Sequence, residues 1–419
     1  TNNNATSITA ISAGVGDIAF DQRGIGHLTV TEMRAVEGDI VVSADDDIVT
    51  LAVATAATLP GAGDIRILAR DGDLTVAGSG IAAVGSEAEV VLTANGEDEE
   101  VTIDAVVTTE SGNITVAAGD DVNVNANVTV LSGGHTVSVT AGDDIFVNDG
   151  VTVTDLGGII MLNAFEDIEL DGSLWAAAAG STSPDAGAVV LTAGQTIRDD
   201  TGPTQGIRAG TLNIMGAMLV GDDADDLPLP GVTSDNGWLD TDVAQLNVSN
   251  VTGSAFILEQ NDIELGSVDA DLTYDDHFAL HARNIALGDV DAQDGLVTLI
   301  ASGAIDDDLG DAGENAANFA IDLTARSLYL SAQNGIGATR PIETSAQSIL
   351  RAVTATNDIA LTNVSDVDTV VGELAVTSIS GAGDITFDQA GAGDVTFNQV
   401  RTPNGDIRLA TDASDLTAV

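Results

Sequence analysis

The sequence has no cysteine and no lysine, and aromatic residues make up only 3% of its 419 residues. Without cysteine, the fold contains no disulfide and no metal site with thiolate ligands. All twelve basic residues are arginine, against 66 acidic residues, which gives a formal net charge of −54. A chain this acidic repels phosphate groups and anionic lipids, so we expect neither nucleic acid nor a membrane surface as a partner.

Long hydrophobic runs are absent as well. No stretch of eighteen apolar residues occurs, so the sequence predicts no transmembrane helix and no membrane insertion. No basic segment precedes an apolar run in the manner of a signal peptide. The chain begins with TNNNATS at Thr1, and we interpret it as a processed or excised part of a longer polypeptide.

The residues that are abundant are small or β-branched. Hydrophobic residues account for 44% of the chain, and with so few aromatics the core must consist of Val, Ile, Leu and Ala. Such side chains suit the narrow, regular interior of stacked strands.

One short phrase recurs along the chain and predicts the secondary structure. It consists of a turn residue pair, usually Gly-Asp, followed by an apolar–polar–apolar triplet. The triplet alternates with period two, so its first and third residues face the same side of a strand. In GDITF, Ile385 and Phe387 are therefore expected to point inward and Thr386 outward, and Asp384 is expected to bond to its own backbone in the turn. The phrase occurs thirteen times, at 16–20, 38–42, 63–67, 72–76, 112–116, 120–124, 143–147, 166–170, 261–265, 357–361, 383–387, 393–397 and 405–409.

The spacing of these phrases indicates a stack of coils. Asp17 and Asp39 are 22 residues apart, and Asp143 and Asp167 are 24 apart. We predict an all-β fold, a parallel β-helix (β-solenoid) of roughly 17–20 coils with loop insertions. An array of β-sandwich domains is the competing fold, because hairpins give similar short spacings.

The chain divides into three parts by regularity. Residues 1–170 predict a regular solenoid, residues 171–245 a less regular solenoid with loop insertions, and residues 246–419 a solenoid that continues to the C-terminus. The middle part holds four of the seven prolines and the acidic segment GDDADDLPLP (221–230).

The segment 301–363 carries a family resemblance. Its phrases IG…PIET…L and NDIALTN alternate with forms such as GAVVLTAGQTI (187–197) and GLVTLIASGAI (295–305). This pattern resembles the repeats of filamentous-haemagglutinin-like giant bacterial adhesins, including passengers of two-partner secretion systems. The resemblance implies a right-handed parallel β-helix, export to the cell surface, and a role as an adhesive or structural fibre. The chain departs from that family in having no recognisable secretion domain and no lysine.

Acidic clusters are the candidate ligand sites. They lie at 45–47, 97–100, 222–226 and 306–308. Our first interpretation of these clusters is a charged, solvated surface. Where they bind ions, we expect Ca²⁺, because it prefers oxygen ligands. None follows the EF-hand spacing. The favoured metal ligands are Asp222, Asp223, Asp225 and Asp226, which lie in a segment that could wrap an ion.

Catalysis is not expected. A β-helix can be a polysaccharide lyase or hydrolase, but so many carboxylates make any acidic pair uninformative. Arg198 beside Asp199 and Asp200 is the nearest lyase-like cluster, and a surface ion pair explains it equally well. His277 and His281 would face one side of a strand, about 13 Å apart and too far to share a metal.

These observations predict a structural segment of an extracellular or cell-surface fibre or adhesin, a stiff acidic rod that is not an enzyme and requires no cofactor. Its expected partners are itself, by end-to-end stacking or continuation of a longer chain, and cell-surface glycans. The alternatives are a carbohydrate-active β-helix and a Ca²⁺-dependent adhesion array of β-sandwich domains.

Overall fold

The computed structural model describes residues 6–11, 15–58, 62–177, 186–199, 206–221, 237–307, 321–379, 382–412 and 415–418. Within these residues every regular element is a strand, and no helix is long and apolar enough to cross a membrane. The strand pairings described there are all parallel, and together they form a β-solenoid of about 16 turns. The predicted all-β parallel solenoid is thus confirmed, and the sandwich array is wrong, because its hairpins would pair antiparallel.

The number of turns is slightly below the predicted 17–20 because some coils are long. Val122 pairs with Ile145, a step of 23 residues, whereas Ile168 pairs with Ile197, a step of 29. The acidic segment 221–230 of the less regular middle part lies outside the described residues apart from Gly221.

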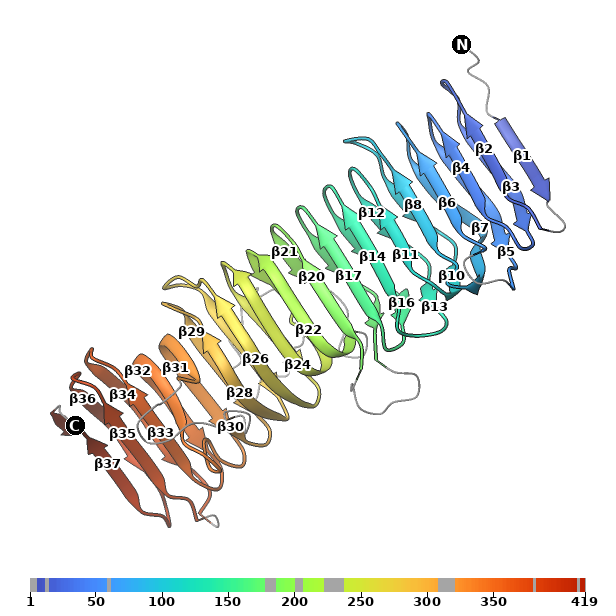
Figure 1. The fold of residues 1–419 in the computed structure, drawn as a ribbon. Coiled ribbons are helices and arrows are strands. Elements are labelled where there is room, and N and C mark those ends of the chain that lie inside the picture. Colours follow the sequence, from blue (N-terminus) through green and yellow to red (C-terminus); the bar gives the residue numbers. More distant parts are fainter. Residues whose placement is uncertain are drawn as a thin grey trace. The chain divides into compact units, whose positions relative to one another are not determined.

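The chain forms two compact units. Unit 1 comprises Thr1–Leu212 with Pro228–Gly237, and unit 2 comprises Asn213–Leu227 with Trp238–Val419. Figure 1 shows the strands of each unit stacked side by side along the sequence.

Unit 1 has three faces, each a ladder of parallel strands (Figure 1). The first face contains β2 (Ile18–Gln22), β4 (Ile40–Ala44), β6 (Ile65–Ala69), β8 (Val90–Ala94), β11 (Ile114–Ala117), β14 (Thr136–Ala141), β17 (Ile159–Ala164) and β20 (Ala188–Thr192). The second contains β1 (Thr6–Ile11), β3 (Leu28–Ala35), β5 (Ile48–Thr55), β7 (Leu74–Ser86), β9 (Val101–Ile103), β12 (Val122–Val124), β15 (Ile145–Val147), β18 (Ile168–Leu170) and β21 (Thr196–Arg198). The third contains the C-terminal parts of β5 and β7, then β10 (Val107–Ser111), β13 (Val128–Val130), β16 (Thr152–Asp155), β19 (Ser173–Trp175) and β22 (Ile207–Ala217).

Unit 2 follows the same principle with longer strands. After β23 (Leu219–Val220) and β24 (Leu239–Val251), one ladder contains β25 (Ala255–Glu259), β27 (His277–Ala282), β29 (Leu296–Ala301), β31 (Leu323–Ala332), β32 (Ile342–Thr354), β34 (Thr369–Val376), β36 (Val395–Arg401) and β38 (Leu416–Ala418). The other contains β26 (Asp262–Ala270), β28 (Asn284–Asp291), β30 (Ile305–Asp307), β33 (Ile359–Val364), β35 (Ile385–Ala390) and β37 (Ile407–Thr411), and the N-terminal parts of β31 and β32 pair with it.

The recurring phrase forms the core as predicted. A strand begins within or directly after the turn pair of each of the thirteen phrases. Ile385 and Phe387 are fully buried while Thr386 is only partly so. Equivalent residues of successive coils pair directly, as Ile40, Ile65 and Val90 do, so the interior consists of continuous rows of aliphatic side chains.

The aspartate of the phrase has a different role from the predicted one. Its carboxylate bonds not to its own backbone but to the next coil: the N–H of Asp39 donates to Asp17 Oδ1 at 3.0 Å, and the N–H of Asp64 donates to Asp39 Oδ1 at 3.0 Å. The same bond recurs in unit 2, where the N–H of Asp406 donates to Asp384 at 2.8 Å. The phrase therefore encodes coil-to-coil bonding as well as a turn.

Candidate functional site: an acidic corner in unit 1

Carboxylates gather where the first face of unit 1 turns into the second. Successive coils place one or two acidic residues at this turn, directly before the strands β5, β7, β9, β12, β15 and β18. We call this set the acidic corner; it consists of Asp46, Asp47, Asp73, Glu99, Glu100, Asp120, Asp121, Asp143, Asp144, Glu166 and Asp167.

The residue immediately before each strand forms an inner row that is fixed by backbone bonds. Four of these carboxylates, those of Asp47, Asp73, Asp121 and Asp144, accept the N–H of the counterpart one coil further on, so their positions are set by the stacking of the coils. The bonds run from Asp73 N–H to Asp47 (3.1 Å), from Glu100 to Asp73 (2.9 Å), from Asp144 to Asp121 (3.0 Å), and from Asp167 to Asp144 (2.8 Å).

The preceding residues form an outer row beside the inner one. Their backbones continue the stack, since the N–H of Asp143 donates to the carbonyl of Asp120 and that of Glu166 to the carbonyl of Asp143. Three sets of carboxylates have ligand atoms within 4.8 Å of one another: Asp47, Asp73 and Glu99; Glu100, Asp120 and Asp121; Asp143, Asp144 and Glu166. Oxygen atoms this close are the donor set that a hard divalent cation such as Ca²⁺ prefers.

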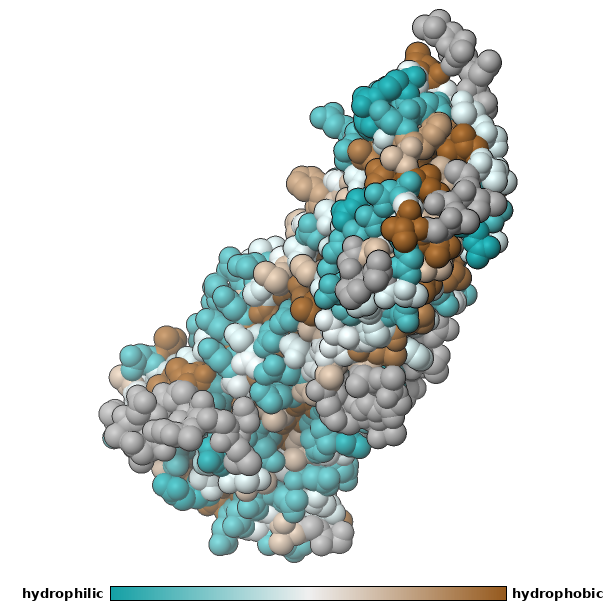
Figure 2. All heavy atoms as spheres, turned by 45° about the vertical axis from the view of Figure 1, so that its right-hand side comes forward, coloured by the Kyte–Doolittle hydropathy of each residue, from teal (hydrophilic) through white to brown (hydrophobic). Residues whose placement is uncertain are grey.

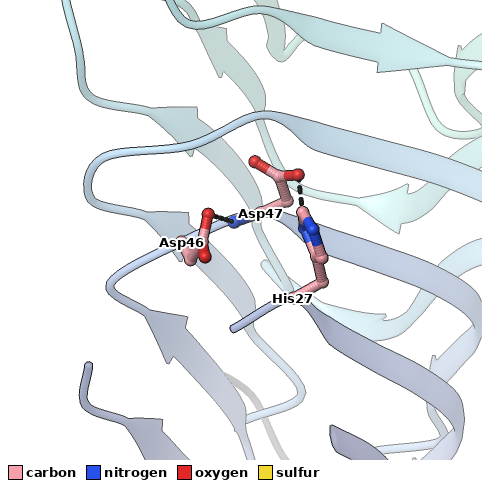
Figure 3. Close-up of side chains that lie close together, drawn as sticks. All are labelled: His27, Asp46 and Asp47. Atoms are coloured by element: carbon pink, nitrogen blue, oxygen red, sulfur yellow. Dashed lines mark hydrogen bonds and ion pairs between the residues drawn. The ribbon is translucent and has the colours of Figure 1, made fainter. Parts of the chain in front are cut away.

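A histidine lies at the N-terminal end of the corner. His27 Nδ1 is 2.5 Å from Asp47 Oδ2, and both Asp46 oxygens accept backbone N–H groups, from Gly26 at 2.7 Å and from Asp47 at 3.1 Å. Figure 3 shows the three side chains side by side on neighbouring coils. One nitrogen and two carboxylates within 4.8 Å could also hold a metal ion of intermediate hardness.

The corner raises the pKa of its own carboxyl groups. Partial burial is the largest cause of a raised pKa at Glu99, Glu100 and Asp120. The next cause is a hydrogen bond with the Asp73 carboxyl at Glu99 and the charge of neighbouring acids at Glu100 and Asp120. At Glu166 the charge of Asp143 is the largest cause of a raised pKa. In the described part of the chain, the His27 contact is the one ion pair that reaches these residues. The acidic corner therefore carries concentrated, uncompensated negative charge that protons or cations would relieve.

A nearby acidic group is neutralised instead. Arg70 bonds Asp21 at 2.8 Å and Asp45 at 2.9 Å, and Arg23 bonds Asp21 at 2.8 Å; we call these four residues the Arg70 cluster. The hydrogen bond from Arg70 is the main cause that lowers the pKa of Asp21 to about 2. That of Asp45 is lowered chiefly by the backbone N–H of Gly24.

Unit 2 contains a buried acid of a different kind. Glu259 is 3% exposed and accepts bonds from Thr241 Oγ1 (2.8 Å) and from the N–H groups of Val243 (2.9 Å) and Asn261 (2.7 Å). Burial raises its pKa to about 7 in spite of these donors. Its contacts close the corner of a coil, so the arrangement is structural.

The structure brings together two of the four predicted acidic clusters. Asp47 of the 45–47 cluster and Glu99 of the 97–100 cluster meet across Asp73. The favoured ligands Asp222, Asp223, Asp225 and Asp226 lie outside the described residues. In the 306–308 cluster, Asp306 accepts the N–H of Thr339 at 3.0 Å and Asp307 faces Arg340 at 3.5 Å, while Asp308 lies outside the described residues.

The lyase-like candidate is described only in part, and the two histidines remain separated along one strand. Arg198 belongs to β21 and Asp199 is buried, and Asp200 lies outside the described residues. His277 and His281 lie on the strand β27, as expected, which keeps them four residues apart on an extended backbone.

Sequence reasoning missed Asp73, Asp120, Asp121, Asp143, Asp144 and Glu166 as members of one site. The signal was present in the doubled acid that replaces Gly-Asp in DDV (120–122), DDI (143–145) and EDI (166–168). Phrases with a doubled acid belong to the second face, whereas Gly-Asp phrases begin strands of both the first and the second face.

Hydrophilic residues cover much of the face drawn in Figure 2, with hydrophobic residues in smaller groups between them. The chain matches no family model, no curated protein and no solved structure. The structure therefore shows a parallel β-solenoid, with an ordered double row of carboxylates along one corner of unit 1.

Proposed function

We propose that the chain is a structural segment of an extracellular or cell-surface fibre or adhesin of the filamentous-haemagglutinin-like kind, and that it is not an enzyme. The observation that carries the proposal is the use of the recurring polar residue. A carboxylate oxygen of each of Asp17, Asp39 and Asp64 accepts a hydrogen bond from a backbone N–H of the next coil. Aspartate occupies this position in twelve of the thirteen phrases, so its use for stacking favours a structural role.

The physics of stacking supports stiffness. Each strand bonds its neighbours on both sides, and aliphatic rows keep the interior dry, so bending a unit would break many bonds at once. The negative surface keeps such a protein soluble in salt outside the cell. Acidic and uncharged surface glycans that present hydroxyl groups or cation bridges are the partners proposed for it.

Surface exposure is the direct test of this proposal. Intact cells that produce the protein are treated with a protease that cannot enter them, and the chain is followed with an antibody. We expect rapid loss of the antibody signal while a cytoplasmic control protein remains. Protection of the chain until the cells are lysed would contradict the proposal.

The absence of catalysis is tested separately. Purified protein is incubated with neutral and acidic polysaccharides, and new reducing ends and unsaturated uronates are measured. We expect none above the level of a heat-unfolded sample. Release of either product would favour the carbohydrate-active alternative.

We propose in addition that Ca²⁺ binds the acidic corner. The raised pKa values of Glu99 and Asp120 and the short separations of their neighbours support it. Melting in Ca²⁺ and in EGTA at equal ionic strength tests it: we expect a higher melting temperature in Ca²⁺. The double variant Glu99→Gln/Asp120→Asn should lose part of this difference.

A charge-matched control separates binding from screening. Asp275 and Asp294 are exposed residues of unit 2, and Asp275→Asn/Asp294→Asn removes the same charge. This control should keep the full Ca²⁺ effect. An equal response of both variants, or no response of the wild type, would mean that Ca²⁺ acts only as a screening ion.

A further inference from the structure

The turns that lead from the first to the second face of unit 1 differ in length from coil to coil. Residues 23–27 form this turn between β2 and β3, residues 45–47 between β4 and β5, and residues 70–73 between β6 and β7. The middle turn has three residues, against five in the turn before it and four in the turn after it. A short turn between two longer ones leaves a hollow, because both neighbours extend further from the strands.

A cavity of about 450 Å³ lies at this hollow. It is lined by Gly24, Ile25, Asp45, Asp46, Arg70 and Asp71. The lining comes from all three turns, so described coils bound the cavity on both sides. Its volume lies within the range of small-molecule sites, roughly 300–1,000 Å³.

The polar groups of the cavity are held in place by bonds within the protein. Asp45 accepts the N–H of Gly24 at 2.8 Å through one carboxylate oxygen and Arg70 Nη1 at 2.9 Å through the other, which ties the two longer turns together. Arg70 Nη2 donates to Asp21 at 2.8 Å and to Ser43 at 2.7 Å. Groups fixed in this way lose little conformational freedom when a ligand binds, which favours affinity.

The lining keeps both donors and acceptors for a ligand. A guanidinium has five N–H donors, and the three bonds of Arg70 leave two of them. Each carboxylate oxygen of Asp46 accepts one backbone N–H, which leaves a lone pair on each oxygen. The side chain of Asp71 is exposed, so its carboxylate is accessible as a further acceptor.

The charge and polarity of the lining select the class of ligand. Three carboxylates face one guanidinium, so the cavity repels carboxylated and phosphorylated ligands, while the guanidinium repels a simple cation. Hydroxyl groups satisfy both kinds of lining group, because they donate to carboxylates and accept from a guanidinium. Ile25 adds an apolar contact for the C–H groups of a sugar ring. These properties together fit a neutral sugar.

We propose that this cavity binds a neutral sugar segment of a surface glycan. Its hydroxyl groups donate to Asp46 and Asp71 and accept from Arg70, and the apolar side of the ring packs on Ile25. The inference rests on the proposed function and deepens it, since it names the class of glycan and places the binding site in unit 1.

Titration of the purified chain with neutral disaccharides tests the inference. Maltose, cellobiose, lactose and mannobiose are added to about 50 mM and binding is followed by calorimetry. We expect at least one of them to bind with a dissociation constant of about 1 mM, and glucuronate to bind at least tenfold more weakly. The titration is repeated in EGTA, where we expect the same dissociation constant, because the proposed contacts are direct.

Two variants remove lining side chains that hold no other part of the cavity. Ile25→Ser and Asp71→Ala should each weaken binding about tenfold. Leu131→Ser is the control for the first, because Leu131 is 62% exposed and Ile25 is 64% exposed. Asp149→Ala, at an exposed residue elsewhere in unit 1, is the control for the second. Both controls should bind as the wild type does, and circular dichroism checks the fold of each variant.

Several outcomes would overturn the inference. Absence of binding for all four disaccharides would do so, as would equal weakening in the cavity variants and their controls. Loss of binding in EGTA would mean that a cation bridges sugar and protein, and tighter binding of glucuronate would contradict the ligand class. These measurements use purified protein, so their failure leaves the protease test on cells intact, and protection of the chain on cells leaves the sugar affinity intact.

Discussion

The acidic corner and the Arg70 cluster are built alike and behave in opposite ways. Both lie in unit 1 at turns or at the ends of strands, and both bring together carboxylates from successive coils. In the Arg70 cluster, guanidinium groups lie 2.8 Å from Asp21 and 2.9 Å from Asp45, and the pKa of each carboxyl is lowered. In the acidic corner the neighbours are other acids, and the pKa of Glu100 or Asp120 is raised.

The difference shows that the position of a carboxylate and the pKa of its carboxyl group have separate causes in this fold. Stacking and backbone N–H groups place the carboxylates whether or not a cation is near. Whether a carboxylate charge destabilises the folded state depends on the charged side chains around it. Because the chain has only twelve arginines for 66 acids, many carboxylates lack a cationic neighbour. The acidic corner is therefore the region of unit 1 most sensitive to protons, salt and divalent cations.

The largest loss of stability is expected at a carboxylate that both accepts a backbone N–H and carries charge within the acidic corner. Asp144→Ala removes the acceptor of the Asp167 N–H and leaves that partly buried donor unbonded. We expect the free energy of unfolding to fall by about 1 kcal/mol or more in denaturant titrations. We expect loss of the hydrogen-bond acceptor to change the free energy of unfolding more than loss of the negative charge does.

Asp144→Asn separates the two contributions. An amide oxygen still accepts the Asp167 N–H, and one negative charge disappears from among Asp121, Asp143 and Asp167, whose charges oppose ionisation of Asp144. Its stability should equal or exceed that of the wild type. A loss as large as that of the alanine variant would show that the carboxylate charge itself holds the coils together.

The sequence predicted the strands well because their signal is local. A turn pair followed by an alternating triplet determines where a strand begins and which side chains are buried, and Ile385, Thr386 and Phe387 obey it. The parallel stack followed from the spacing of the phrases. The number of turns was less certain, because the step from Ile168 to Ile197 is longer than the common one.

The site was harder to predict because it depends on which residues become neighbours across coils. Asp47 and Asp73 are 26 residues apart, and Asp73 and Glu100 are 27 apart, while Asp121 and Asp144 are 23 apart. No single period aligns them, so clusters within one turn, such as 97–100, were visible and rows across turns were not. The role of Asp17 in bonding the next coil escaped prediction for the same reason.

A smaller effect is expected when the Arg70 cluster is made to resemble the corner. Arg70→Met removes the cation that lies against Asp21, Asp45 and Ser43 and keeps the length of the side chain. We expect lower stability at neutral pH and a stronger dependence on salt, because the two acids then repel each other. The same substitution at Arg408, a more exposed arginine 3.3 Å from Asp388, should have little effect. An unchanged Arg70→Met protein would mean that solvent already screens this cluster.

The smallest effect, and the one that separates the two regions most directly, is the response to mild acid. A carboxyl whose pKa is raised in the folded state takes up a proton before its unfolded counterpart does. Protonation of Glu99, Glu100, Asp120 and Glu166 should therefore stabilise unit 1 as the pH falls from 7 toward about 4, the range of unfolded carboxyl groups.

The Arg70 cluster has the opposite sign: its stabilisation is present above about pH 4 and is lost as the pH falls toward 2, where Asp21 becomes protonated. Melting temperatures measured at low salt should rise slightly from pH 7 to 5 and fall below 4. The variant Glu99→Gln/Glu100→Gln/Asp120→Asn/Glu166→Gln should be flatter between pH 7 and 5 and unchanged below 4. Because Glu259 of unit 2 also takes up a proton near pH 7, the same series is run on Glu259→Gln, whose residual rise reports the corner alone. A rise that persists in the quadruple variant and vanishes in Glu259→Gln would place the acid response in unit 2 and remove the acidic corner as its source.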